Sequence, residues 1–159
     1  MNIFALDLDP EQAAQWHVDR HVIKMPLEYA QLLSTAHVLL DGVQRGYKPT
    51  HNNHPSAQWA RSSRSGYLWL FELFRYTSFE YRHRYGRNHK SWDELSDTLN
   101  TPPDAIIERG WFPPFMAMPA EYLVIGKCVN SYRDYYNRGK RDLHAWSLRD
   151  RPYWITDDD

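Results

Sequence analysis

The chain has 159 residues, a formal net charge of −1 and a single cysteine, Cys128. This length suits one domain with its own hydrophobic core, while a lone cysteine excludes an internal disulfide and favours a reducing compartment. The near-neutral charge argues against a protein that neutralises many DNA phosphates, which leaves a small ligand or one local DNA-binding patch.

No apolar run approaches the roughly 18 residues that a membrane span needs. Residues 1–7 lack the basic and apolar regions of a signal peptide. We therefore expect a cytoplasmic protein with no membrane partner. Aromatic residues make up 15 % of the chain, which suits either helix packing or a surface that stacks on flat rings.

Residues 1–159 are predicted to form one all-α domain of about four to five helices with long irregular connections. Asp9 followed by Pro10 is typical of a helix start. This helix should continue as far as Pro26, which marks a kink or the first turn of a second helix. Only residues 3–6 hint at a strand.

Apolar periodicity and capping residues predict the later helices. One should end at Gly42, a long one should span about 56–85, and Ser91 should open a short one with a capping box. The last helix should begin at Pro119. Residues 43–55 form a long polar connection, and connections of this length are often functional.

The first candidate site is the pair His17 and His21, whose i and i+4 spacing would place both rings on one helix face. Such a pair can ligate zinc when a third donor, for instance Glu28 or His54, joins it. The alternative is two half-buried histidines that form hydrogen bonds within a helix interface. This alternative is the stronger one, so we expect no metal and no cofactor.

The second candidate site is Lys24 with Glu28, again at i and i+4. On a solvated helix face the two would form an ordinary ion pair worth about 0.3–0.5 kcal/mol. Beside His21 and on a strongly apolar helix, the pair could instead be partly buried. A buried carboxylate next to a cation has a tunable pKa, which suits general acid or base catalysis.

A donor-rich cluster lies in the polar connection and the start of the helix after it. It would either bind an oxyanion or phosphate or simply cap the following helix. Its members, all candidates for substrate binding, are His51, Asn53, His54, Trp59 and Arg61.

The stretch 75–90 is both cationic and aromatic. It is either a phosphate-binding and base-stacking patch or a solvated helix face. The expected phosphate contacts in this stretch are Arg82, Arg84 and Lys90. A smaller basic cluster could extend the patch, and it consists of Arg133, Arg138, Lys140 and Arg141. Cys128 lies on an apolar helix stripe and is more typical of a core residue than of a nucleophile.

Residues 21–33 read His-Val-Ile-Lys-Met-Pro-Leu-Glu-Tyr-Ala-Gln-Leu-Leu, and His54-Pro55, Trp59 and a long aromatic helix follow. Together these segments resemble the pyrimidine-dimer DNA glycosylase superfamily, which includes the phage endonuclease V-like enzymes. They are more similar to uncharacterised phage and bacterial relatives of that group. The resemblance covers roughly the first half of the chain.

The resemblance implies a single all-α domain that flips or kinks a damaged nucleotide in DNA. It also implies attack on the sugar C1′ by an N-terminal α-amine, which forms an imine while a glutamate assists. Here the amine would belong to Met1, since Asn2 should leave Met1 in place, and the glutamate would be Glu28. His54 would lie near the lesion pocket, and the basic aromatic helix would contact DNA phosphates.

The sequence therefore predicts a glycosylase- or lyase-like DNA-repair hydrolase, acting at an N-glycosidic bond of a nucleic acid or nucleotide. Glu28 would be the general base or electrostatic stabiliser, and His21, Lys24 and His54 would position the substrate. The alternative is a non-catalytic phage protein that sequesters a nucleotide or cyclic nucleotide signal. DNA or a small nucleotide is the expected partner in either case, and a homo-oligomer remains open.

Overall fold

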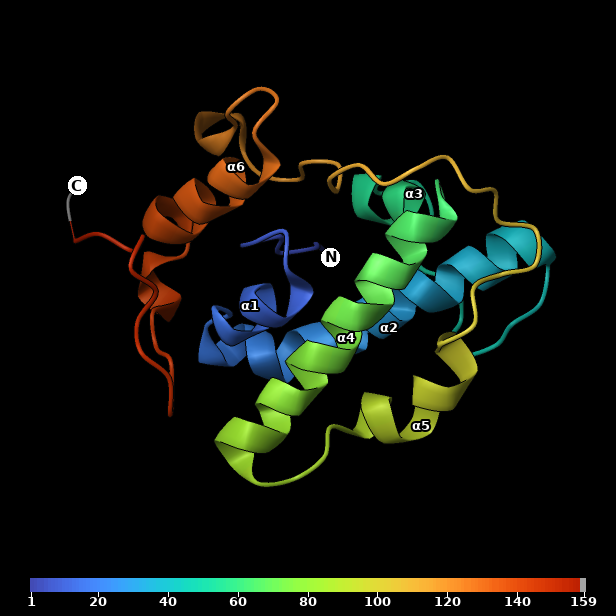
Figure 1. The fold of residues 1–159 in the computed structure, drawn as a ribbon, viewed down its shortest axis with the longest axis horizontal. Coiled ribbons are helices and arrows are strands. Elements are labelled where there is room, and N and C mark those ends of the chain that lie inside the picture. The colour runs from blue at the N-terminus through green and yellow to red at the C-terminus, as the bar shows by residue number, and fades with distance from the viewer. Residues whose placement is uncertain (158–159) are drawn as a thin grey trace.

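The computed structural model describes residues 1–157, which fold into helices joined by irregular chain, with no strand among them (Figure 1). The expected all-α class is therefore confirmed. The hint of a strand over residues 3–6 is wrong, since these residues run as irregular, buried chain through the core. No helix within the described range is both long and apolar enough to cross a membrane.

Two separate helices replace the single kinked helix expected near the N-terminus. Helix α1 spans Pro10–Gln15, and the side chain of its N-cap Asp9 accepts a hydrogen bond from Glu11 N at 3.1 Å. Helix α2 spans Asp19–Asp41 and continues through Pro26. The expected boundary at Pro26 is therefore wrong, because the break lies ahead of α2.

Side chains from distant segments stabilise the break between α1 and α2. The guanidinium of Arg84 donates to the carbonyl oxygens of Gln15 and His17, at 2.9 Å and 2.8 Å. The indole of Trp146 donates to the carbonyl oxygen of Trp16 at 2.8 Å. These bonds satisfy the carbonyl groups at the end of α1 that a continuing helix would otherwise use.

Helices α3 (Pro55–Ala60) and α4 (Arg64–Tyr85) divide the single long helix that the periodicity predicted. The break at residues 61–63 depends on Ser63, whose hydroxyl lies 2.8 Å from a carboxylate oxygen of Glu108. This contact draws the chain toward a loop that is remote in sequence. Local periodicity therefore could not locate the break.

Helix α5 spans Lys90–Leu99, and its N-cap is His89 in place of the expected Ser91. The Nδ1 atom of His89 accepts a hydrogen bond from Ser91 N at 3.1 Å, so the capping group is an imidazole. Residues 100–127 then form a long connection with little regular structure.

Short helical pieces make up the C-terminal part of the chain. They are η1 (Ala120–Tyr122), α6 (Cys128–Asp134), the π-helical turn η2 (Tyr135–Gly139) and η3 (Arg141–Leu143). The prediction of one long helix from Pro119 is therefore wrong, because several short helical pieces replace it. Cys128 is buried, and its burial raises the pKa of the thiol to about 12, which confirms the core assignment.

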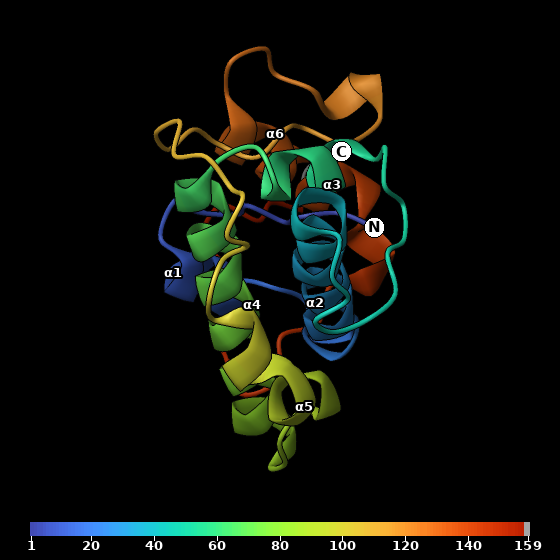
Figure 2. The same ribbon diagram turned by 90° about the vertical axis from the view of Figure 1, so that its right-hand side faces the viewer.

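Helices α2 and α4 pack against each other at the centre of the fold, and α1 packs on α4 (Figures 1 and 2). The N-terminal segment lies between α6 and this central pair. Phe4 N donates to the hydroxyl of Tyr29 on α2 at 3.3 Å, while Tyr132 on α6 donates to Asn2 Oδ1 at 2.7 Å. The segment thus ties α6 to the centre and places residue 1 beside α2.

Candidate functional site

Asn2 fixes the position of the chain next to residue 1. Its amide nitrogen donates to Ala117 O at 2.7 Å, and its amide oxygen accepts from Ile3 N at 2.8 Å as well as from Tyr132. Ile3 is fully buried. Since the segment after Met1 is held on both sides, the α-amine of Met1 is preorganised in one place.

The α-amine of Met1 lies 3.1 Å from Oε1 of Glu28 on α2. The side chains of the two residues are only 2 % and 12 % exposed, so the ion pair is largely shielded from water. Within the described residues Glu28 forms no ion pair with Lys24. The expected surface pair of Lys24 and Glu28 is therefore wrong, because the carboxylate binds the amine instead.

This amine–carboxylate pair opens into a pocket of about 150 Å³ between the N-terminal segment, α2, the first residue of η2 and Lys140 just after η2. Pockets that enclose a drug-sized ligand usually measure about 300–1,000 Å³. The pocket therefore suits the reacting end of a larger ligand and not a whole nucleotide. Its chemically active members are Met1, His21, Lys24, Glu28, Tyr135 and Lys140.

Positive charge prevails in the Met1–Glu28 pocket. Lys24 and Lys140 line it together with the α-amine, and among the lining residues only Glu28 carries negative charge. The Nζ atom of Lys140 lies 5.0 Å from the ring centroid of Tyr135. Such an excess of cations favours an anionic ligand, for instance one that carries phosphate groups.

His21 is a neutral hydrogen-bonding group in this pocket. Burial, followed by electrostatic interaction with His17 and the positive charges of Lys140 and Lys24, lowers its pKa from 6.5 to about 2. Its Nδ1 lies 2.6 Å from the hydroxyl of Tyr136, which itself accepts a bond from Val18 N. The hydroxyl of Tyr136 is buried and has no other hydrogen-bond acceptor within residues 1–157, so it donates to Nδ1, which leaves the ring hydrogen on Nε2.

His17 is fully buried and has both ring nitrogens engaged. Nδ1 donates to Ala13 O at 2.7 Å, and Nε2 accepts from the hydroxyl of Tyr29 at 2.7 Å. Burial lowers the pKa of His17 to about 3, so its ring is neutral at neutral pH. His17 precedes α2, which contradicts the shared helix face, and it has no nitrogen left for the considered zinc site.

Metal ligation finds no support in the rest of the site either. Within residues 1–157 no group of three His, Cys, Asp or Glu side chains is arranged to hold a metal ion. The rings of His17 and His21 do lie near each other, 6.4 Å apart between centroids. Each ring is committed to a tyrosine hydroxyl, so the pair acts in packing and orientation.

His54 caps α3 and lies near the amine–carboxylate pair. Its Nδ1 accepts a hydrogen bond from Ser56 N at 3.0 Å, which confirms the capping interpretation. Partial burial lowers the pKa of His54, and the positive α-amine of Met1 lowers it further. The imidazole is therefore biased toward its neutral form beside the pocket without lining it.

Comparisons with protein-family models, curated proteins and solved structures find no match to this chain. The functional inference below therefore rests on the geometry of the site.

Two residues expected to contact substrate are buried instead. Trp59 lies in the core, and its indole donates to Phe112 O at 3.2 Å. Arg84 is buried between Glu80 and Asp19, with nitrogen–oxygen distances of 2.9 Å and 3.0 Å. The expected contacts of Trp59 and Arg84 with substrate are therefore wrong, because both side chains are enclosed by protein.

The remaining expected contacts lie on or near the surface but outside the Met1–Glu28 pocket. Arg82 is bound to Asn88 at 2.9 Å, and Lys90 lies 3.8 Å from Glu94. Contact of Arg82 and Lys90 with phosphate stays a prediction. The same holds for substrate contacts by His51, Asn53 and Arg61.

Sequence reasoning did not find Tyr135 as a member of the site, and it found Lys140 only as part of a basic cluster. Both follow α6 and reach the pocket because α6 packs on the N-terminal segment. No local pattern marks them. The π-helical turn that carries Tyr135 is a form often found at functional positions, but it becomes visible only in the folded chain.

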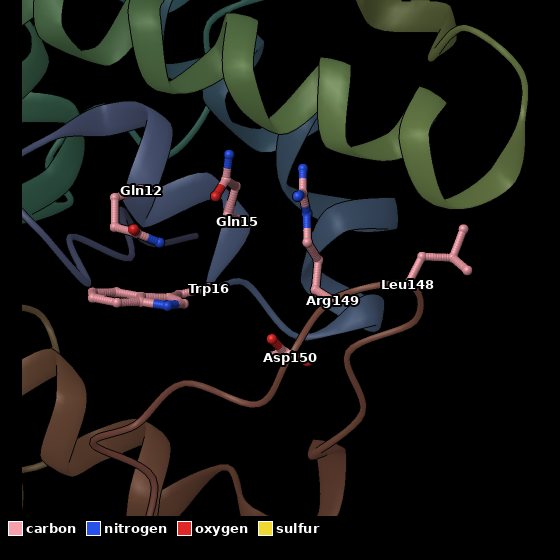
Figure 3. A pocket seen from close by; sticks show the side chains of 6 residues that line it. All are labelled: Gln12, Gln15, Trp16, Leu148, Arg149 and Asp150. Atoms are coloured by element: carbon pink, nitrogen blue, oxygen red, sulfur yellow. The ribbon is translucent and has the colours of Figure 1, made fainter.

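A larger hollow of about 530 Å³ lies beside α1 (Figure 3). Its lining includes Trp16, the amides of Gln12 and Gln15, and Arg149 from the C-terminal segment. The guanidinium of Arg149 is bound at 2.6 Å to buried Glu80, a carboxylate that it shares with Arg84. The hollow lacks a nucleophile next to a base, so the smaller Met1–Glu28 pocket is the better catalytic candidate.

Proposed function

We propose that this protein is an enzyme acting at an N-glycosidic bond in DNA, with the α-amine of Met1 as nucleophile and Glu28 as proton acceptor. The observation that carries the proposal is the shielded 3.1 Å contact between these two groups. A nucleophile and a base within hydrogen-bond reach, inside a pocket, form the usual arrangement for covalent catalysis.

The reaction begins with a proton transfer, because an ammonium group has no lone pair. Glu28 takes this proton. The neutral amine attacks C1′, so the nitrogen–C1′ bond forms as the glycosidic bond breaks. The base leaves with the bonding electron pair and receives the proton from Glu28.

The adduct at C1′ then opens to an imine. A proton moves from the attached nitrogen to O4′ of the sugar, the C1′–O4′ bond breaks, and a protonated imine remains. Water hydrolyses this imine, which restores the α-ammonium group of Met1 and leaves an abasic sugar. All bonds and protons balance with water as the only co-reactant.

The size and the charge of the pocket support a polymeric substrate. A pocket of about 150 Å³ accepts a sugar while the rest of the substrate stays outside. Lys24 and Lys140, which line it, suit the flanking phosphates. The Nε2 hydrogen of His21 is available to bind a sugar oxygen and orient C1′ toward the amine.

Borohydride trapping tests this proposal. The protein is incubated with an oligonucleotide that contains an abasic site, and borohydride reduces any imine to a stable secondary amine. We expect a covalent adduct that peptide mass spectrometry maps to Met1. An extension of the chain ahead of Met1 should abolish the adduct, since it replaces the amine by an amide.

Glu28→Gln separates catalysis from binding. It should lower the rate of adduct formation strongly while affinity for the oligonucleotide is retained, because the amide cannot accept the proton. Glu72→Gln is the matched control, since this glutamate forms only a partly exposed pair with Arg75 on α4. Equal trapping by Glu28→Gln, or an adduct that maps to Lys24, would remove the assignment.

Nucleotide sequestration is the second candidate, and the hollow beside α1 favours it. Its volume of about 530 Å³ falls within the range of small-ligand sites, and it offers an indole and two amides (Figure 3). Equilibrium dialysis with nucleotides, compared with Trp16→Ala, tests this function. Recovery of unchanged nucleotide from the wild-type protein alone would support it.

A further inference from the structure

A separate hollow of about 320 Å³, which we call the α2–α5 hollow, lies where helices α2 and α5 end. Helix α2 ends at Asp41 and helix α5 ends at Leu99, and the two helices pack against each other. The connection after α5 runs past the end of α2 (Figure 1). There Asp41 accepts backbone hydrogen bonds from Asp104 N at 2.8 Å and from Ala105 N at 2.9 Å.

Acidic residues occupy both of these helix ends. The last residue of α2 is Asp41, and Asp97 lies in the last turn of α5, whereas neither last turn contains a basic residue. The C-terminus of a helix carries partial negative charge, so carboxylates are unfavourable there and cations are favourable. A sequence that breaks this rule at two neighbouring helix ends indicates a functional reason.

Negative charge prevails in the α2–α5 hollow. Its lining includes one guanidinium, that of Arg45, and three carboxylates, those of Asp41, Asp97 and Asp104. Arg45 is exposed, and within residues 1–157 it forms no ion pair with any of the three. The bond from Ala105 N lowers the pKa of Asp41, so this carboxylate is charged at neutral pH. The lining therefore carries a net charge of −2.

His37 adds an unpartnered hydrogen-bond acceptor to the wall of this hollow. The hydroxyl of Tyr67 donates to Leu99 O at 2.7 Å, so its oxygen accepts from Nε2 of His37 at 2.8 Å. Burial lowers the pKa of His37, so the ring is neutral and its Nδ1 carries a lone pair and no hydrogen. Nδ1 has no hydrogen-bond partner within residues 1–157, although His37 is only 3 % exposed.

The free nitrogen of His37 is the one that remains for a ligand in the hollow. The imidazole lines the hollow together with Thr101, whose carbonyl group interacts with it. Nε2 is already bound to Tyr67, which is fully buried in the core. Native proteins satisfy nearly all buried polar groups, because a buried acceptor without a donor is costly. Nδ1 therefore indicates a ligand that supplies a donor.

The chemistry of the α2–α5 hollow matches an organic ammonium ion. An ammonium group has three donors and no acceptor, and the hollow offers carboxylate oxygens, a bare imidazole nitrogen and two negative helix ends. A metal ion fits less well, since in the described part of the chain no three His, Cys, Asp or Glu side chains are arranged to hold one. The net charge of −2 matches a diamine, and about 320 Å³ accommodates a short one.

We propose that the α2–α5 hollow binds a short organic diamine. One ammonium group is held by His37 and Asp41, which share a face of α2 at i and i+4, and the other is held by Asp97 on α5. The site is independent of the proposed function, because it shares no lining residue with the Met1–Glu28 pocket. Along α2, Asp41 lies about 20 Å beyond Glu28 at the helical rise per residue.

Calorimetric titration with putrescine, at constant ionic strength, tests this site. We expect one stoichiometric site for putrescine and no binding of the diol with the same carbon chain, whose ends are neutral. Asp97→Asn should weaken the binding of putrescine by about tenfold, since it removes a charge-assisted hydrogen bond. Asp93→Asn is the matched control, because it removes the same charge from the exposed first turn of α5, outside the hollow.

Two further measurements separate binding from folding. The nitrogen NMR signal of His37 Nδ1 should shift when putrescine is added, because its lone pair then accepts a hydrogen bond. Without putrescine, Asp97→Asn should unfold at no lower urea concentration than the wild-type protein, because the substitution removes a carboxylate from a helix C-terminus. Weaker binding by a variant of unchanged stability would support the site.

Several results would overturn the diamine site. Absence of putrescine binding is one, and equal weakening by Asp97→Asn and Asp93→Asn is another, since binding would then follow net charge alone. Binding that leaves the signal of His37 Nδ1 unchanged would place the diamine elsewhere. Stoichiometric binding of Mg²⁺ in preference to putrescine would show a metal site instead. None of these results bears on borohydride trapping at Met1, so the proposed function is decided separately.

Discussion

Lowering the pH from 7 to 5 should destabilise the protein through its two buried histidines. Burial lowers the pKa of His17 to about 3 and that of His21 to about 2, against 6.5 for an ordinary histidine. Between pH 7 and pH 5 these two histidines therefore bind protons in the unfolded chain but not in the folded chain. Stability from these rings is complete above pH 6.5 and is lost as the pH falls.

The expected loss in the free energy of unfolding follows from proton linkage. A histidine that titrates at about 6.5 when unfolded and stays neutral when folded lowers the free energy of unfolding by about 2 kcal/mol as the pH falls from 7 to 5. Two such residues cost about 4 kcal/mol, out of a typical total of about 5–15 kcal/mol. The pKa values of His37 and His54 are also lowered, mainly by burial, and these residues act in the same direction.

Urea unfolding followed by tryptophan fluorescence at the two pH values measures this effect. His21→Gln should lose a large part of the pH dependence, whereas His83→Gln, at an exposed position, should keep it. A free energy of unfolding that is equal at pH 7 and pH 5 would refute the reasoning. An NMR titration in which His21 gains its proton near pH 6.5 would refute it as well.

Three further changes test the structural roles described above. Arg84→Ala should lower the free energy of unfolding by about 1–3 kcal/mol, because it leaves the buried carbonyl oxygen of His17 without its donor while Arg149 still pairs with Glu80, and Arg84→Lys should recover part of this loss. Arg82→Ala should change it by no more than about 0.5 kcal/mol, and similar losses in both alanine variants would contradict the burial argument. Gly139→Ala should cost about 1–3 kcal/mol in urea unfolding, since its Cβ would lie 2.6 Å from a ring carbon of Tyr135. Calorimetric titration with zinc should give no stoichiometric binding, and a tight site would contradict the neutral, fully bonded histidines.

The local sequence predicted those helix ends that depend on local chemistry. Asp9 caps α1, and Gly42 and Gly86 close α2 and α4 in the left-handed region, at φ values of 70° and 72°. A glycine adopts this conformation at little cost, so its place in the sequence is informative. The break before α2 depends instead on Arg84 and Trp146, which no local pattern connects to it.

The candidate site divides in the same way. Glu28 and His21 could be singled out from the sequence, and Met1 entered through a family resemblance. Tyr135 and Lys140 reach the pocket from the far end of the chain. Their contribution depends on packing between α6 and the N-terminal segment, a contact across more than 100 residues.

The sequence by itself determined an all-α chain and the early segment, residues 17–28, in which the chemistry is concentrated. Only the tertiary structure decided which groups these side chains contact. Glu28 binds the α-amine of Met1 at 3.1 Å and not Lys24, since Asn2 and its buried neighbours bring the amine to α2. Helical spacing indicates which side chains share a helix face. The folding of the N-terminal segment decides which of these side chains contacts the α-amine.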